Sequence, residues 1–313
     1  MSGFRPRDTE LLTLPDNRKL SYATYGDTTS PDAPVIFYFH SFPSSHHEGA
    51  QLDVAAQNHG VRLIAPDRPG IGYSTFLPQR RLLDWPMDIL ALADHLGIPQ
   101  FAVLASSSGA PYALACYHKI PRSRLCGAGI IAGAYPKALG AQRILLEHWT
   151  ALYVVPWMPS LLAVGLEWSF GKYTRAREQP KEFEALVERV YSTRADVDKA
   201  VWKNNESGIR DIVHESVREA FRESSWGPAY ELKLYGADWG FDLSCMNVKK
   251  GSLVLWHGAR DVNVPLSVVE KAAQMTGAEL RVGPDEGHTS LTLRKADECV
   301  KTIRDILIRD SGP

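Results

Sequence analysis

The chain has 313 residues, of which 44% are hydrophobic and 23% charged, the composition of an ordinary soluble globular protein. Its 35 basic and 36 acidic residues give a formal net charge of −1, so no charge excess indicates binding to nucleic acid or to an anionic membrane. The amino terminus lacks an apolar signal core, and no apolar run approaches the roughly 18 residues that span a bilayer, so we expect a cytoplasmic protein.

Strands and helices alternate along most of the chain. Residues 10–26 predict a β-hairpin, because two strand-like runs flank the turn residues Asp16 and Asn17. Six further runs predict strands, and they span residues 35–40, 61–67, 101–106, 127–133, 252–258 and 278–284. Helices are predicted at residues 83–96 and 294–309. The alternation predicts an α/β fold with a mostly parallel central sheet flanked by helices.

One long segment, residues 135–242, breaks this alternation. It predicts one helix after another, at residues 143–155, 159–170, 181–193, 195–203 and 211–223. We interpret the segment as an inserted all-helical cap, or lid, on a core domain made of residues 1–134 and 243–313. The segment contains six of the chain's eight tryptophans, which favours a substrate with apolar surface, although any one of them is more often a packing residue.

Three consecutive serines lie between a predicted strand and a predicted helix, in the stretch VLASSSGAPYALA (residues 103–115). A nucleophile on such a tight turn requires small residues two positions before and after it, because larger side chains would clash with neighbouring elements. Ser106 fails this test because Leu104 precedes it, whereas Ser107 is flanked by alanine and glycine. Ser108 is flanked by serine and alanine and lacks the glycine that a left-handed turn prefers after the nucleophile. The pattern favours Ser107.

The stretch resembles the nucleophile elbow of the α/β-hydrolase superfamily. Other segments resemble that family's oxyanion loop, the turn after an early strand, the acid loop and the histidine loop. In the family's order they are HSFP (40–43), DRPGIGYS (67–74), HGARDVNVP (257–265) and DEGHTSL (285–291). The resemblance spans about residues 10–305 and implies an α/β-hydrolase fold with the helical cap as an insertion.

The resemblance also implies a catalytic triad in the chain order serine, aspartate, histidine. A serine hydroxyl is a weak nucleophile, so it needs a base to take its proton and an acid to orient that base. His288 follows the last predicted strand, and Asp261 lies at the carboxyl end of strand 252–258, where α/β sheets place functional groups. A rival acid position follows strand 127–133, but no carboxylate stands there.

Acyl transfer further requires two backbone N–H groups that point at the developing negative charge, the oxyanion hole. The resemblance assigns these groups to Phe42 and to Ser108, the residue after the nucleophile. Ser41 stands where the family commonly has a glycine, because the backbone bends sharply there.

We expect no cofactor and no metal site. His46 and His47 are adjacent, and adjacent residues rarely bind one ion, while Gly70 and Gly72 lack the lysine and the spacing of a phosphate-binding loop. The four cysteines form no CxxC pair and favour reduced, packed thiols. They are Cys116, Cys126, Cys245 and Cys299.

The function that these residues predict is a carboxylesterase-like serine hydrolase. Ser107 would attack the carbonyl of an ester, lactone or thioester of a small, partly apolar substrate, and water would release the acyl group. A lyase, isomerase or acyltransferase with the same triad is an alternative if the lid excludes water, and so is a proline-iminopeptidase-like peptidase. A ligand receptor that keeps the fold is less favoured. Neither the acyl chain nor the oligomeric state follows from these motifs.

Overall fold

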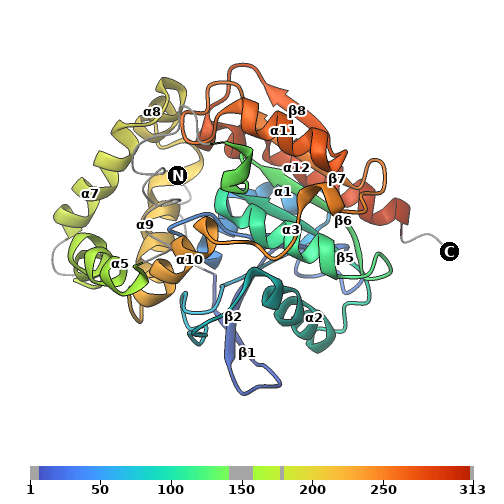
Figure 1. Cartoon of the computed structure of the whole chain (residues 1–313), viewed down its shortest axis with the longest axis horizontal. Coiled ribbons are helices and arrows are strands. Elements are labelled where there is room, and N and C mark those ends of the chain that lie inside the picture. Colours follow the sequence, from blue (N-terminus) through green and yellow to red (C-terminus); the bar gives the residue numbers. More distant parts are fainter. Residues whose placement is uncertain (1–6, 141–157, 177–179, 311–313) are drawn as a thin grey trace.

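The computed structural model describes residues 7–140, 158–176 and 180–310 (Figure 1). At its centre is an eight-stranded sheet with the order β1-β2-β4-β3-β5-β6-β7-β8. β1 (Glu10–Thr13) and β2 (Lys19–Gly26) form the predicted hairpin, and β2 pairs antiparallel with β4. All other pairs are parallel, as expected. These strands are β3 (Val35–Phe39), β4 (Arg62–Pro66), β5 (Phe101–Ser106), β6 (Leu125–Ile131), β7 (Leu253–Gly258) and β8 (Glu279–Gly283).

Both faces of the sheet are covered by helices. Successive side chains of a strand point to opposite faces, so a continuous apolar run places apolar side chains on both faces, and helices bury them. In β3, Val35, Phe37 and Phe39 belong to one buried cluster, while Ile36 and Tyr38 belong to another. The first cluster includes residues of α2 (Trp85–His95), α3 (Ala110–Lys119) and α11 (Leu266–Thr276). The second includes residues of α1 (Asp53–Asn58) and α12 (His288–Asp310). The continuous apolar runs in the sequence therefore report strands that are buried on both faces.

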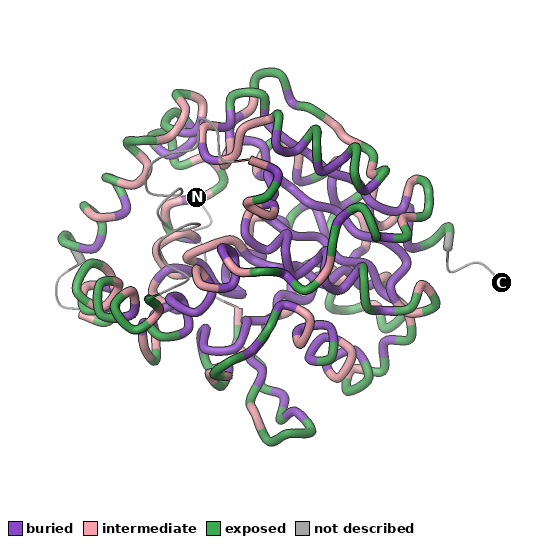
Figure 2. Tube along the Cα trace, in the orientation of Figure 1, coloured by how far each residue is buried: buried purple, intermediate pink, exposed green. Residues whose placement is uncertain are grey.

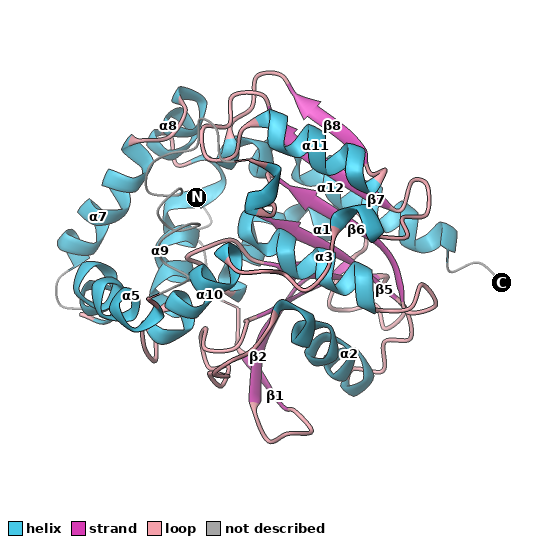
Figure 3. Cartoon of the chain, in the orientation of Figure 1, coloured by secondary structure: helices cyan, strands magenta, loops and turns pink. Residues whose placement is uncertain are grey.

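Every described element between η4 (Lys137–Leu139) and α10 is helical, and we call residues 137–236 the helical insertion (Figure 3). Its larger helices are α5 (Pro159–Leu166), the π-helical turn η6 (Glu167–Gly171), α6 (Lys172–Arg175), α7 (Pro180–Ser192), α8 (Asp196–Lys203), α9 (Ile209–Ala220) and α10 (Trp226–Gly236). The predicted helix at 143–155 lies outside the described residues. The sequence did not predict α10, because Gly227 and Pro228 resemble helix breakers; both stand in the first turn, where backbone N–H groups lack helical partners anyway.

The helical insertion is less buried than the sheet (Figure 2). Its cluster of buried apolar residues is small and includes Phe183, Val201 and Trp202 from α7 and α8. Of its described tryptophans, Trp202 is buried, whereas Trp168 is 69% exposed. No helix in the described ranges is both long enough and apolar enough to cross a membrane.

Candidate active site

The turn between β5 and α3 holds Ser107 in a backbone conformation that few residues other than glycine adopt. Its φ angle is 49°, in the left-handed region, so the strained residue is the serine itself. The sequence suggested that the glycine was needed for a left-handed turn, and this was wrong, because Gly109 has a φ of −70°. A Cβ on Gly109 would lie 2.3 Å from the carbonyl oxygen of Phe39, so the glycine is needed for close approach to the end of β3.

The structure brings Ser107, His288 and Asp261 into one row of hydrogen bonds. Nε2 of His288 lies 2.9 Å from Oγ of Ser107, and Nδ1 lies 2.7 Å from Oδ2 of Asp261. Oδ1 of Asp261 accepts the backbone N–H groups of Asn263 and Val264 at 2.7 and 3.1 Å. Although burial opposes ionisation, the charge and hydrogen bond of His288 lower the pKa of Asp261. The carboxylate is therefore charged where it faces the imidazole.

A second histidine, His257 at the end of β7, supports the loop that carries Asp261. Its Nε2 donates a hydrogen bond to the carbonyl oxygen of Val264 at 2.9 Å and lies 3.7 Å from Oδ2 of Asp261. Burial lowers the pKa of His257, so its ring is neutral near pH 7. A neutral, buried ring that bonds the backbone shapes the acid loop rather than transferring protons.

The loop after β3 is held by Glu48, a residue that the sequence analysis did not single out. Both carboxylate oxygens accept the backbone N–H of Ser41, at 3.0 and 3.1 Å, and one also accepts its hydroxyl. The hydroxyl of Tyr38 donates to the same carboxylate at 2.6 Å. Ser41 thus makes a side-chain contact that a glycine could not make. Phe42 and Ser108, the predicted oxyanion-hole residues, both line the same cavity as Ser107.

The fully buried Arg68 joins this loop to the helical insertion. Its guanidinium donates to the carbonyl oxygens of His40 and Ser41 at 2.7 and 3.0 Å, and it pairs with Glu231 of α10. Although burial opposes the charged form, the charge of Arg68 lowers the pKa of Glu231. Burial and the same positive charge lower the pKa of His40 to about 4, so this histidine is neutral at neutral pH. A cation–π contact with the Tyr112 ring, 4.7 Å away, completes the surroundings of Arg68.

Asp198 of α8 holds the backbone on which His288 stands. Its carboxylate accepts the N–H groups of His288, Thr289 and Ser290, each at 2.9 Å. These are the first N–H groups of α12, which have no partner within the helix. This is why α12 begins at His288, whereas the sequence predicted a helix only from residue 294. A Cβ on Gly287 would lie 2.5 Å from an Asp198 oxygen, which explains the glycine before the histidine.

The row of hydrogen bonds opens into a cavity of about 270 Å³ that the sheet and the helical insertion line together. The insertion contributes five aliphatic side chains to the lining, namely Val187, Val190, Val213, Val217 and Leu232. Phe170, Tyr191 and Tyr235 add aromatic surface, but none of the described tryptophans lines the cavity. The apolar lining from the insertion thus comes from these side chains and not from its tryptophans.

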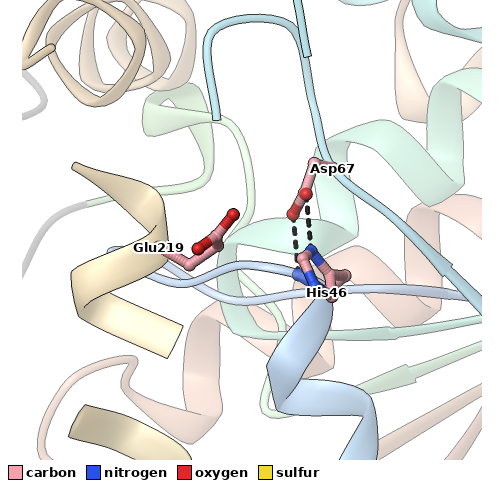
Figure 4. Close-up of side chains that lie close together, drawn as sticks. All are labelled: His46, Asp67 and Glu219. Atoms are coloured by element: carbon pink, nitrogen blue, oxygen red, sulfur yellow. Dashed lines mark hydrogen bonds and ion pairs between the residues drawn. The ribbon is translucent and has the colours of Figure 1, made fainter. Parts of the chain in front are cut away.

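His46 lies close to Asp67 and Glu219, with one candidate metal-ligating atom of each within 4.8 Å of the others (Figure 4). These atoms are already engaged. Nδ1 of His46 lies 2.6 Å from Asp67, whose carboxylate also accepts the hydroxyl of Ser21, while Glu219 accepts the guanidinium of Arg222. The sequence pairs His46 with its neighbour His47 and gives no sign of these partners, which lie 21 or more residues away. These hydrogen bonds stay within the core, from His46 to Asp67 and Ser21, and within the helical insertion, from Arg222 to Glu219 of α9, which lies beside the histidine.

Comparison with known proteins agrees with this architecture. The model of the alpha/beta hydrolase family matches residues 36–302. Among curated proteins, the 30 kDa magnesium-chelatase subunit of Rhodobacter capsulatus is 31% identical over 103 residues. That match covers 32% of this chain and 36% of the relative, so the chain spans about a third of the length of the curated relative that it matches.

Several solved structures share the fold over almost the whole chain. An esterase from Thermogutta terrifontis is 18% identical, with a TM-score of 0.66 and coverage of 97% of this chain and 100% of its own. An enol-lactonase from Burkholderia xenovorans LB400 is 19% identical, with a TM-score of 0.66 and coverage of 96% and 100%. E-2-(acetamidomethylene)succinate hydrolase is 15% identical, with a TM-score of 0.69 and coverage of 95% and 99%. Because the family model matches most of its length, the chain belongs to the alpha/beta hydrolase family.

Proposed function

We propose that the protein is a serine hydrolase that cleaves an ester-type bond, in a carboxylic ester, lactone or thioester, through an acyl-enzyme. One observation carries the proposal. Ser107, His288 and Asp261 form a continuous row of hydrogen bonds, with Ser107 on a strained turn at the wall of a largely apolar cavity. The esterase and the enol-lactonase among proteins of the same fold agree with this activity.

In the proposed mechanism, Oγ of Ser107 attacks the substrate carbonyl carbon while Nε2 of His288 takes its proton. Asp261 keeps the second imidazole proton on Nδ1 and stabilises the imidazolium that forms. The backbone N–H groups of Phe42 and Ser108 stabilise the negative charge on the carbonyl oxygen. His288 then gives its proton to the leaving group. In the second half of the reaction, His288 takes a proton from a water molecule, which attacks the acyl carbon, and then returns this proton to Oγ of Ser107 as the acyl–serine bond breaks.

The helical segment has a role in substrate binding under this proposal. Residues 135–242 act as a cap on a core made of residues 1–134 and 243–313, and the substrate binds between the two. Support comes from the cavity wall, to which Val213 of α9 and Pro265 before α11 both contribute. A small, partly apolar substrate fits a cavity of about 270 Å³ with aliphatic walls.

A fluorophosphonate probe tests the nucleophile, since it reacts covalently with an activated serine. We expect it to label the natural protein and the Ser108→Ala variant but not the Ser107→Ala variant. Ser108→Ala is the matched control, because it removes a neighbouring hydroxyl and keeps the backbone N–H. Labelling that survives Ser107→Ala would contradict the assignment.

Hydrolysis is tested separately with p-nitrophenyl hexanoate. We expect steady release of p-nitrophenol that depends on Ser107. A burst of release, without a steady rate unless an alcohol acceptor is added, would instead support the acyltransferase alternative.

A further inference from the structure

The charged side chains that face the cavity are mostly positive. Among the described residues, Lys137 and Arg194 contribute positive charges and Glu48 a negative one, while His288 belongs to the row of hydrogen bonds with Ser107. Charges beside apolar walls act more strongly than charges in bulk water, because the local dielectric constant is lower. The wall of the cavity therefore favours an anionic group over a cationic one.

Glu48 does not neutralise Arg194 by direct contact. Both of its oxygens accept hydrogen bonds from Ser41, and one accepts the Tyr38 hydroxyl. The carboxylate is almost completely buried, with 4% of the residue exposed. No ion pair joins Glu48 to Arg194 within the described parts of the chain. Glu48 thus serves the loop after β3 and is poorly placed to bind a substrate cation.

Arg194 lies in the connection between α7 and α8, half-buried at the cavity wall. Its Nη1 donates to the side-chain oxygen of Asn263, a neutral amide, and no carboxylate of the residues that the structure describes pairs with it. A guanidinium has five N–H donors in a planar fork that matches a carboxylate. Most of these donors therefore remain for a ligand.

Arg194 lies at the same cavity as the proposed reacting groups. Asn263, its partner, donates its backbone N–H to Asp261, and Asn263, Arg194, Ser107 and His288 all line the same cavity. The aliphatic side chains of α7 and α9 line part of the wall, together with Phe42 and Tyr135. An anionic group held by Arg194 and a carbonyl group at Ser107 would thus belong to one small molecule with an apolar middle.

We propose that Arg194 binds a free carboxylate of the substrate, so that the substrate class is an ester or lactone with a carboxylate on a short apolar chain. This inference rests on the proposed ester hydrolysis for its kinetic consequence. The binding of the carboxylate itself does not require catalysis.

Two chromogenic esters of equal chain length test the kinetic consequence. They are p-nitrophenyl hexanoate, which is neutral, and the mono-p-nitrophenyl ester of adipic acid, which ends in a carboxylate. We expect the natural protein to have a kcat/KM about 10- to 100-fold higher for the adipate ester, the range of charge-assisted hydrogen bonds. Arg194→Gln should remove most of this preference, chiefly by raising KM, and Arg194→Lys should keep part of it.

Two control variants make the test specific. Arg189→Gln removes the same charge from the exposed side of α7 and should keep the preference. Lys137→Gln removes the other cation of the wall and should reduce the preference less than Arg194→Gln does. An equal preference in the natural protein and in Arg194→Gln, or a preference that depends on Lys137 alone, would overturn the inference.

A binding measurement separates this inference from the proposed function. In the Ser107→Ala variant, calorimetric titration with adipate should show binding that weakens about 10- to 100-fold when Arg194→Gln is added. If the fluorophosphonate does not label the natural protein but adipate binding depends on Arg194, the hydrolase proposal fails and the carboxylate site stands. If labelling and hydrolysis occur but Arg194→Gln leaves adipate binding unchanged, only the proposed carboxylate site is wrong.

Discussion

The core sheet and the helical insertion contribute to the site in different ways. Ser107 and Asp261 follow buried strands of the core, and His288 begins the core helix α12. The insertion reaches the same place with Asp198, which holds the backbone of His288, and with Glu231, which pairs with Arg68 under the loop after β3. The proposed chemical groups therefore come from the core, whereas the insertion holds their backbone in place and forms much of the cavity wall.

The largest expected effect lies in the core. In Asp261→Asn, a neutral amide replaces the carboxylate that faces Nδ1 of His288, so the imidazolium loses its stabilising charge. We expect kcat for p-nitrophenyl hexanoate to fall by about 10⁴-fold. Asp285→Asn is the control, since Asp285 lies in the histidine loop but its side chain is 77% exposed. A loss of less than about tenfold would remove Asp261 from the proposed triad.

The next largest effect tests the contact between the two regions. Glu231→Gln leaves the guanidinium of Arg68 buried without its charged partner. Breaking a buried pair on one side costs about 3–5 kcal/mol, and both side chains here are fully buried. Urea unfolding should show a loss of this size, whereas Glu223→Gln, at an exposed position, should unfold like the natural protein. Equal stability of the two variants would show that the insertion is not anchored through this pair.

A smaller effect is expected where the insertion supports the proposed base. In Asp198→Asn, an NH2 group replaces one of the two carboxylate oxygens that accept three backbone N–H groups. Because this NH2 group is itself a donor, the N–H groups in the first turn of α12 lose part of their hydrogen bonding. We expect a loss of about 1–3 kcal/mol of stability and a fall in kcat of roughly 10-fold, with KM less affected. Asp196→Asn, two positions earlier and 98% exposed at its side chain, is the control. A fall in stability with unchanged kcat would limit Asp198 to a structural role.

The smallest effect concerns the link between His46 and Asp67. Although burial opposes its charged form, Asp67 raises the pKa of His46 above the ordinary value of 6.5. This contribution to stability is complete below pH 6.5 and is lost as the pH rises through the raised pKa. Asp67, whose pKa His46 lowers to about 2 against burial, contributes above pH 3.8 and loses its contribution in stronger acid.

Melting temperatures measured from pH 6 to pH 9 test that sign. Over this pH range, the melting temperature of the natural protein should fall by about 2–4 °C more than that of His46→Gln. A loss of roughly 1 kcal/mol in the free energy of unfolding causes a shift of this size in a large domain. His95→Gln, at an exposed position, should follow the natural protein. A steeper loss in His46→Gln would reverse the proposed direction of the shift.

The same comparison explains what the sequence could predict. The central parallel strands of the core are compact apolar runs, so their positions follow from the local pattern, and the observed bounds of β5 are the predicted ones. The segments with Ser107 and Asp261 each follow such a strand, which makes them visible in the sequence. The structure brings these residues and His288 together, whereas their catalytic roles stay proposals.

The contributions of the insertion could not be predicted in this way. Asp198 acts on His288 from 90 residues away, and Glu231 pairs with Arg68 from 163 residues away. Neither carboxylate stands in a motif, and no local property distinguishes them from exposed acidic residues of the same helices. The early start of α12 was missed for the same reason, because the acceptor for its first N–H groups lies in α8.

The helix α12 constrains how the length of the chain can change. It runs for 23 residues from His288, about 35 Å, with Cys299, Val300 and Ile303 packed in the cluster beneath the sheet. Inserting or deleting one residue between His288 and this packed stretch would rotate His288 by about 100° relative to the packed residues. The imidazole would then leave Ser107, or the apolar face would leave the sheet. Relatives that keep this arrangement should therefore vary in length before His288 or after the packed stretch of α12, and not between the two.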